Sequence, residues 1–490
     1  MSTLQSINAR TGEVHGQPLV SSTSEQIHAA VQAAHDAAAL WGASSGAQRA
    51  ALLQGLATAL EGERDKLVAW ADLETALGPV RLNGELDRTA YQLRRFADIA
   101  ARGVPFEQVD DPAVAGAPPV GHPAMRLQRV PLGPVAMFAA SNFPFAFSVL
   151  GGDTASALAA GCPVVVKAHP GHPGLSQLVF GLIQRVLNEQ NLPAGLIGLV
   201  QGAAVEVGVQ LIRHPLIAAG AFTGSTRGGL ALQAEANARP RPIPFYGELG
   251  AINPLVALPA ALAAKGAELA TTLAGSITLG CGQFCTNPGL LVLVDGPETD
   301  AFVPQLVEAL GQQKPHPMLT AGMKSAFDAG IKHFLDAGAL SLLQGQGAAP
   351  APGPQLLQVS AQRFIERAEL REEVFGPSSL IVRCANLAEV QAVLAAVAGS
   401  LTVTLWGADD DTAENRALVR GATAIAGRVL FAGVPTGVAV TAAQQHGGPW
   451  PASTAPMTTS VGDAALQRFL RPVCLQDAPA WLVARAGVPC

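Results

Sequence analysis

Short apolar runs alternate with helical patterns over residues 131–446, and this alternation constrains the fold more than any other feature of the chain. The first series of runs is PVAMFAA, CPVVVKA, LIGLVQG, IAAGAFTG and PIPFYGELG. Such runs are typical of strands buried on both faces, as in a parallel sheet built from βαβ units. A second series, NPLVALP, LLVLVDG, SSLIVRC, LTVTLWG and GRVLFAG, predicts another α/β unit from about residue 251 to 446.

The segments on either side of this alternation have a different pattern. Residues 24–102 carry apolar positions at helical spacing, and Thr23 with Gln26 resembles a capping box, so we expect helices there. Residues 103–124 are rich in Pro and Gly and predict a linker, after which MRLQRVPLG indicates an extended segment. The carboxyl end, RFLRPVCLQDAPAWLVARAG, contains an apolar run that could pair with a sheet edge.

The composition agrees with a multidomain globular protein. With 490 residues, of which 49% are apolar and 14% charged, the chain can bury several cores. The net charge of −6 provides no basic surface for nucleic acid or an anionic membrane, which favours a small-molecule substrate. We find neither a signal-peptide pattern nor an apolar run long enough to span a bilayer, so we expect a soluble, cytoplasmic protein.

The cysteines are too sparse for a disulfide framework in a cytosolic chain of this size. Only Cys281 and Cys285 form a close pair, and no second pair of Cys or His lies nearby at zinc-ligand spacing, so no metal is expected. Interest therefore lies in individual thiols. The six cysteines are Cys162, Cys281, Cys285, Cys384, Cys474 and Cys490.

Polar residues and glycines follow the apolar runs of the first series. In open parallel sheets, ligands bind beyond the carboxyl ends of the strands. We therefore expect a binding site where these strands end. The residues at the predicted strand ends are Ser141, Asn142, Lys167, His169, Gly224, Ser225 and Glu248.

One thiol is a candidate nucleophile. Cys285 lies in GCGQFCTNPG, a Gly-flanked turn between a helical pattern and the run LLVLVDG. A thiol presented on such a turn could attack a substrate, with the neighbouring backbone N–H donating to an oxyanion. The alternative is a small apolar residue that fills the turn, as most free cysteines do. From the residues alone, Cys281 is an equal candidate.

Two polar side chains could assist that thiol. Glu248, in FYGELG, ends an apolar run, and in a dry crevice its pKa would be raised so that it could act as a general base on water. Asn142, in AASNFPF, could donate its amide to a developing oxyanion. The alternatives are a solvated Glu at a strand end and an Asn in a turn before Pro144.

Six motifs in order, SNFPF, VVVKAHP, FTGS, ELG, GQFCT and EVFGP, resemble the aldehyde dehydrogenase superfamily over nearly the whole chain. The resemblance implies the α/β fold of that family, with a Rossmann-like cofactor-binding domain at 1–112 and 131–250 and an α/β catalytic domain at 251–446. Oligomerisation elements are implied at 113–130 and 467–490. The hairpin near 113–130 is expected to pair with the carboxyl-terminal strand of a neighbour, in a homodimer or homotetramer.

The same resemblance assigns roles residue by residue. It makes Cys285 the nucleophile, Glu248 the general base and Asn142 the oxyanion donor, and Cys281 becomes a bystander. Lys167 would bond the adenosine ribose, FTGS would lie against the pyrophosphate at a helix start, and EVFGP would hold the nicotinamide ribose and ring. The implied cofactor-binding residues are Ser141, Lys167, His169, Pro170, Thr223, Gly224, Ser225, Leu249, Glu373 and Phe375.

Further stretches are similar to an NADP-type branch that includes α-ketoglutaric semialdehyde (2,5-dioxopentanoate) dehydrogenases and some long-chain aldehyde dehydrogenases; they include HGGPWPAST and RFLRPVC. The implied reaction oxidises α-ketoglutaric semialdehyde to 2-oxoglutarate through a Cys285 thiohemiacetal and thioester. A long-chain or other aliphatic aldehyde is the alternative substrate. Pro170 stands where NAD-preferring relatives often carry a Glu on the ribose 2′-hydroxyl, so NADP is the expected cofactor and NAD is also allowed.

Three other functions are weighed against this one. A coenzyme-A-acylating dehydrogenase would not need Glu248, and a noncatalytic scaffold need not keep Cys285, Glu248, Asn142 and Lys167 together. A Cys/His hydrolase needs a His that deprotonates the thiol, and the sequence nominates none. His446, in QQHGGPWPAST, is expected to stabilise its loop or to contact substrate.

Overall fold

The amino-terminal region is a short hairpin followed by four helices. The computed structural model describes residues 2–483, and Cys490 with the last part of the predicted 467–490 element lies outside them. The capping box predicted at Thr23 and Gln26 is present, and Ser45 with Gln48 forms a second one. The elements are β1 (Thr3–Ile7), β2 (Val14–Val20), α1 (Ser24–Gly42), α2 (Gly46–Gly62), α3 (Arg64–Thr75) and α4 (Pro79–Ala101).

The first series of apolar runs forms one parallel sheet, as the alternation predicts. Its strand order is β7-β6-β5-β8-β9, and every neighbouring pair is parallel. The strands are β5 (Val135–Phe138), β6 (Val164–Lys167), β7 (Ile197–Val200), β8 (Ala219–Thr223) and β9 (Phe245–Glu248). The helices between them are α5 (Gly152–Ala159), α6 (Pro173–Glu189), α7 (Val205–Arg213) and α8 (Thr226–Asn237), and η2 (Ala194–Leu196) precedes β7.

Alternate residues of these strands enter two different cores. Val135 and Met137 pack with the helices α2, α4, α5 and α6, whereas Ala136 and Phe138 pack with α1, α7 and α8 on the other face. Burial on both faces explains why the runs are continuous rather than alternating. Each fully buried Val or Leu contributes roughly 1.5–3 kcal/mol, so the two cores fix the sheet and hence the positions of its strand ends.

The second series forms a seven-stranded sheet in the order β12-β13-β14-β11-β10-β15-β16. The strands are β10 (Pro254–Ala257), β11 (Leu290–Val294), β12 (Leu340–Gln344), β13 (Gln355–Ser360), β14 (Ser378–Cys384), β15 (Ser400–Trp406) and β16 (Ala426–Leu430). The helices are α9 (Pro259–Thr278), α10 (Pro297–Gly311), α11 (Ala321–Asp336), α12 (Ala361–Glu366), η3 (Ala368–Arg371), α13 (Leu387–Ala396) and α14 (Ala413–Ile425). The sequence predicts five of these strands and misses β12 and β13; β12 pairs antiparallel to β13 at the sheet edge.

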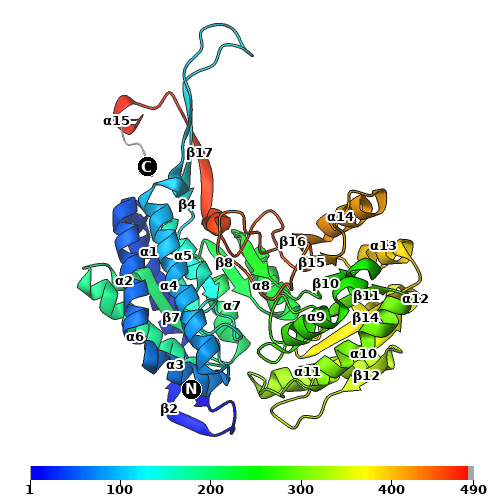
Figure 1. The fold of residues 1–490 in the computed structure, drawn as a ribbon. Helices are drawn as coiled ribbons and strands as arrows, with labels where there is room; N and C mark the ends of the chain where they lie inside the picture. The colour runs from blue at the N-terminus through cyan, green and yellow to red at the C-terminus, as the bar shows by residue number, and fades with distance from the viewer. Residues whose placement is uncertain (1, 484–490) are drawn as a thin grey trace.

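The five-stranded sheet with its helices forms the first lobe, and the seven-stranded sheet with its helices forms the second. A small three-stranded sheet, ordered β17-β4-β3, extends away from the first lobe as an arm (Figure 1). Its elements are η1 (Val104–Phe106), β3 (Val109–Asp111), β4 (Met125–Pro131), η4 (Asp463–Phe469), β17 (Leu470–Gln476) and α15 (Ala480–Val483). The expected pairing of the hairpin with a neighbour's carboxyl-terminal strand stays a prediction. β17 pairs antiparallel with β4 of the same chain, and β3 takes the other edge of β4, so both edges of β4 are already filled.

The irregular segment from 431 to 461 runs between the two lobes (Figure 1). It is tied to the end of β9, because Leu249 N donates to Ala452 O and Gly247 N donates to the hydroxyl of Thr454. This segment therefore lies beside the strand end that carries Glu248. No helix among residues 2–483 has the length and hydropathy needed to cross a membrane.

Candidate active site

The loop that carries Cys285 is a tight turn between α9 and β11. Gly280, Cys281 and Gly282 have φ angles of +55°, +60° and +64°, in the left-handed region that favours glycine. A Cβ at Gly282 would lie 2.2 Å from the carbonyl oxygen of Gly376, so this glycine permits close backbone contact with the EVFGP segment. The turn leads directly into the exposed part of the loop at Cys285.

The two neighbouring thiols lie in different surroundings. Cys281 is buried beside Met318 and Phe327, and burial raises its pKa to about 12. Cys285 is partly exposed and lines a cleft of about 490 Å³. Burial of its sulfur raises the pKa of Cys285 well above the ordinary value, and the charge of Glu248 raises it further. Only Cys285 therefore faces open space, and its thiol needs a base to ionise.

Three side chains from distant segments meet at this sulfur. Nε2 of His446 lies 3.6 Å from Sγ of Cys285 and 3.0 Å from Oε1 of Glu248. The carboxylate, imidazole and thiol donor atoms all lie within 4.8 Å of one another. One imidazole nitrogen thus faces both the thiol and the carboxylate. Thiolate, imidazole and carboxylate groups also bind Zn²⁺ in proteins. Sequence spacing could not reveal this cluster, because its three residues lie far apart in the chain.

Hydrogen bonds from the 431–461 segment hold this cluster in place. Ser460 donates a short hydrogen bond from its hydroxyl to Oε2 of Glu248, and the backbone N–H of Ser460 donates to the carbonyl of His446. Thr459 accepts a hydrogen bond from the backbone N–H of His446. Nδ1 of His446 is buried and has no partner among the described residues. The imidazole is therefore positioned through its backbone and through Nε2.

The pKa of Glu248 does not behave as the sequence predicts. Burial alone would raise it, but the charge and hydrogen bond of His446, together with hydrogen bonds from Ser460 and Cys285, lower it below its ordinary value. The expectation of a raised pKa is therefore wrong, because opposite charge outweighs desolvation here. Glu248 is held as a carboxylate near neutral pH.

Asn142 lies in the irregular segment after β5, close to the nucleophile loop. Its side-chain Nδ2 donates to the carbonyl of Gln283 at 3.0 Å, and its own carbonyl accepts a hydrogen bond from Arg81. Asn142, Ser141 and Cys285 line the same cleft. The structure thus brings together the three residues predicted to act on substrate, Cys285, Glu248 and Asn142.

The rest of the cleft is lined by most of the predicted cofactor residues. Ser225 is the N-cap of α8 and accepts a hydrogen bond from Gly228 N, and the hydroxyl of Thr223 is buried with no partner in the described part of the chain. A Cβ at Gly224 would lie 2.8 Å from the ring of Phe222. The predicted residues that line the cleft are Ser141, His169, Thr223, Gly224, Ser225, Leu249, Glu373 and Phe375.

Lys167 and Pro170 lie just beyond this lining. Nζ of Lys167 donates to the carbonyl of Gly202, and burial lowers its pKa to about 8. Within residues 2–483, no carboxylate lies within 4.0 Å of this ammonium. His169 is half-buried, and burial of its ring first, then the charges of His172 and Lys167, lower its pKa well below the ordinary value. The Lys167 ammonium, the unpartnered hydroxyl of Thr223 and the start of α8 are suited to bind the anionic dinucleotide that the resemblance implies.

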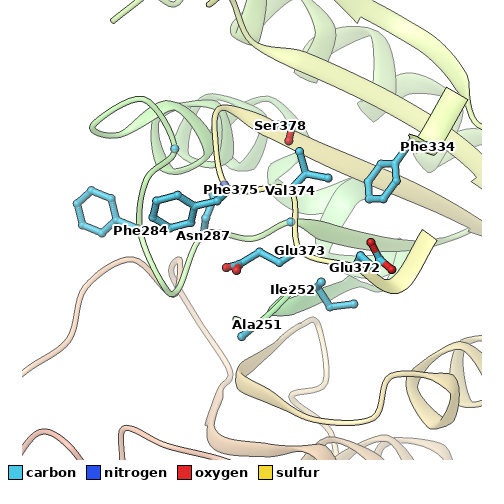
Figure 2. A pocket seen from close by; sticks show the side chains of 12 residues that line it. Ala251, Ile252, Phe284, Asn287, Phe334, Glu372, Glu373, Val374, Phe375 and Ser378 are labelled. Atoms are coloured by element: carbon cyan, nitrogen blue, oxygen red, sulfur yellow. The ribbon is translucent and has the colours of Figure 1, made fainter. Parts of the chain in front are cut away.

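Glu373 and Phe375 enter the cleft from the turn before β14. Figure 2 shows the Glu373 side chain extending between Ala251 and the loop with Asn287, whereas Glu372 points the other way. Asn287 Nδ2 donates to the carbonyl of Gly376, which ties the EVFGP segment to the nucleophile loop. Glu373 is exposed and lines the cleft, so its carboxyl can accept hydrogen bonds from a ligand there.

His446 is the residue that the sequence reasoning undervalued. The statement that the sequence nominates no His beside the thiol is wrong, because the 431–461 segment brings His446 next to Cys285 across 161 positions. No spacing rule joins residues so far apart. The one available signal was a polar His in a loop of Gly and Pro, which is a place where function often resides.

Comparisons with known proteins agree with this geometry. The profile of the aldehyde dehydrogenase family matches residues 1–448. The chain is 45% identical to alpha-ketoglutaric semialdehyde dehydrogenase 2 of Azospirillum brasilense over 97% of this chain and 92% of that protein. It is 39% identical to an alpha-ketoglutaric semialdehyde dehydrogenase of Acinetobacter baylyi over 97% and 91%.

Solved structures support the predicted fold class. Aldehyde dehydrogenase C of Pseudomonas syringae, solved as a cysteine-to-alanine mutant with NAD⁺ and octanal, superposes with a TM-score of 0.82 at 21% identity. The match covers 98% of this chain and 94% of that one. The fold is thereby confirmed, and the family in question uses NAD(P) to oxidise aldehydes. The chain is a member of the aldehyde dehydrogenase family.

Proposed function

We propose that this enzyme oxidises α-ketoglutaric semialdehyde to 2-oxoglutarate, with Cys285 as the nucleophile and NADP as the preferred cofactor. The observation that carries the chemistry is the meeting of Cys285, His446 and Glu248 at the inner end of the cofactor cleft. The substrate is suggested by the names of the two relatives at 45% and 39% identity. A long-chain or other aliphatic aldehyde is the alternative.

The first step in this proposal is ionisation of the thiol. Nε2 of His446 is the nitrogen nearest to Sγ and, in the neutral imidazole, can accept the thiol proton; the Glu248 carboxylate on the same nitrogen stabilises the imidazolium that this transfer forms. The thiolate then attacks the aldehyde carbon, a C–S bond forms, and the carbonyl oxygen becomes an oxyanion. Asn142 Nδ2 and the backbone N–H of Cys285 are the proposed donors to that oxyanion.

The second half of the reaction releases the acid. When bound, a nicotinamide would supply the hydride acceptor for oxidation of the Cys285 thiohemiacetal to a thioester. Glu248 then takes a proton from water, the hydroxide oxygen attacks the acyl carbon, and the C–S bond breaks to release carboxylate and regenerate Cys285. His446 supports this role because it keeps Glu248 ionised near neutral pH. The free hydroxyl of Thr223 and the start of α8 would hold the pyrophosphate, and Glu373 the nicotinamide ribose.

The preference for NADP rests on two residues near the end of β6. Pro170 places no carboxylate where it would repel a ribose 2′-phosphate, and Lys167 supplies a cation that lacks an ion-pair partner in the described chain. We also propose that the chain acts in the cytoplasm as a homodimer or homotetramer. Exposed apolar residues on the arm, among them Val109, Met125 and Leu127, support an oligomer contact there. The three-domain division stays a prediction.

A substrate panel tests the proposal. The purified enzyme is mixed with α-ketoglutaric semialdehyde, succinic semialdehyde or octanal, each with NADP and with NAD, and the absorbance of the reduced cofactor is followed. We expect the highest kcat/KM for α-ketoglutaric semialdehyde with NADP. Cys285→Ala is the matched control and should show no turnover. A clear preference for octanal would support the alternative substrate class and contradict the proposed one.

A further inference from the structure

Three arginines lie around Cys285, away from the residues that line the cofactor cleft. Arg81 and Arg88 are on α4 and Arg428 is on β16. The guanidinium carbon of Arg81 lies 4.6 Å from the ring centroid of Phe284, the residue before Cys285. Arg88 and Arg428 both hold the 431–461 segment, since Arg88 donates to Val438 and Arg428 donates to Pro435 and Gly437.

A chain of ring contacts connects Arg88 to the nucleophile. Its guanidinium carbon lies 5.9 Å from the ring centroid of Phe147, and that ring lies 6.4 Å from the imidazole of His446. His446 in turn contacts Cys285. Burial lowers the pKa of Arg88, and the charges of Glu85, Cys285 and Glu248 offset part of that effect. Arg88 therefore belongs to the surroundings of the reacting sulfur, on the aromatic side.

The three arginines differ in which of their nitrogens are free. Arg428 uses both terminal nitrogens on carbonyls and leaves Nε buried without a partner, and Nη1 is the one nitrogen of Arg81 that is both buried and unpartnered among the described residues. Arg88 uses Nη1 alone, so its Nε and Nη2 are both buried and unpartnered among residues 2–483. These two nitrogens form one edge of the guanidinium, and a planar carboxylate fits such an edge with two parallel hydrogen bonds.

The same edge binds carboxylates elsewhere in this chain. Arg95 donates from Nε and Nη2 to the two oxygens of Asp463, and Arg416 does so to Asp411. Within the described residues, no carboxylate lies within 4.0 Å of Arg88. Its neighbour on the helix, Glu85, instead accepts hydrogen bonds from Phe145 N and Ala146 N. Burial also raises the pKa of Glu85, which weakens its competition for Arg88.

On the basis of the function proposed above, we propose that the Nε–Nη2 edge of Arg88 binds the distal carboxylate of the semialdehyde substrate and thereby determines specificity. A desolvated guanidinium edge without a partner is costly in the free enzyme, and a carboxylate satisfies it in the complex. A neutral aldehyde leaves the edge unpaired, so the enzyme discriminates against it. Cys285 fixes one end of the substrate and Arg88 the other.

The test compares Arg88→Met with Arg88→Lys and with Arg94→Met. Arg94 lies on the same helix, but its guanidinium pairs with Glu61 at the surface, so its loss is a control for changes to α4. For Arg88→Met we expect kcat/KM for α-ketoglutaric semialdehyde to fall on the order of 10–100-fold, chiefly through KM. With pentanal, which has no carboxylate, we expect no fall. Arg88→Lys keeps the charge without the planar edge and should recover part of the loss.

A binding readout separates this inference from the proposed function. Glutarate should protect the wild-type enzyme against thermal unfolding and compete with the semialdehyde, but it should do neither in Arg88→Met. An equal fall with both aldehydes would show that Arg88 only holds Val438 and would overturn the inference. A wild-type enzyme that prefers α-ketoglutaric semialdehyde, beside an unchanged Arg88→Met, would refute the role of Arg88 and leave the proposed function standing. A wild-type enzyme that prefers neutral aldehydes and ignores glutarate would refute both.

Discussion

The two sides of Cys285 are formed by different kinds of residue. The proposed cofactor side consists of strand ends, glycines and the start of α8, and its lining carries few charges. The other side is formed by arginine and phenylalanine side chains from α4, the nucleophile loop and β16. Backbone and small residues can hold a cofactor whose shape is constant. Side chains with a free edge can select among aldehydes that differ in charge.

Glu248 and His446 lie at the junction of the two sides, and in the proposed mechanism they serve the reaction itself. The contrast therefore predicts that variants on the cofactor side change cofactor binding, variants on the arginine side change aldehyde selection, and variants at the junction change the rate. The following predictions test that separation, beginning with the largest expected effect.

Replacing Glu248 with Gln should lower kcat by about 10²–10⁴-fold, because the amide cannot take a proton from water. Hydride transfer should survive, so rapid mixing should show a burst of reduced cofactor close to one per active site, followed by slow turnover. Cys285→Ala is the control without a burst. Loss of the burst in Glu248→Gln would show that this carboxylate acts before hydride transfer. That result would contradict its assignment to thioester hydrolysis alone.

Replacing His446 with Gln should move the acid limb of the kcat profile to higher pH by about 1–2 units. The sign follows from the folded state, in which His446 lowers the pKa of Glu248; without it, burial dominates and the carboxylate protonates at higher pH. The pH dependence of kcat from about pH 5 to 9 measures this shift. An acid limb that stays in place while the burst slows would assign His446 to thiol activation alone.

Replacing Lys167 with Met should raise KM for NADP on the order of 10–100-fold and leave KM for the aldehyde unchanged. Because burial lowers the pKa of Lys167 to about 8, the wild-type KM for NADP should rise as the pH increases through that value and the ammonium loses its proton. KM for NAD should change less. Altered aldehyde selectivity in this variant would contradict the separation of the two sides.

The cofactor side was largely predictable because it depends on local patterns. Each parallel strand is a continuous apolar run, and the residue that follows it, such as Ser141 or Ser225, is fixed by the end of that run. The helices α1–α4 were predictable for the same reason, since their spacing and caps are local. The edge strand β12 was missed because Leu340 and Ser341 are exposed and carry no strong alternation.

The junction and the arginine side could not be predicted because they depend on long-range contacts. His446 reaches Cys285 only through the 431–461 segment, and the free edge of Arg88 becomes visible only when every carbonyl and carboxylate around it is placed. The lowered pKa of Glu248 is a further case, because it depends on His446 and Ser460. Sequence indicates where a strand ends, but not which distant loop closes over that end.

The late position of that closing segment has a consequence for biosynthesis. Ser460 is 212 residues beyond Glu248, and at about 5–20 residues per second the ribosome needs roughly 10–40 s to make the intervening chain. During that interval the first sheet can already form, but Glu248 lacks Ser460 and His446, and Asp153 lacks its buried partner Arg468. The nascent chain can therefore hold a folded first sheet before the contacts of Glu248 with His446 and Ser460 exist, and those contacts form only near the end of translation.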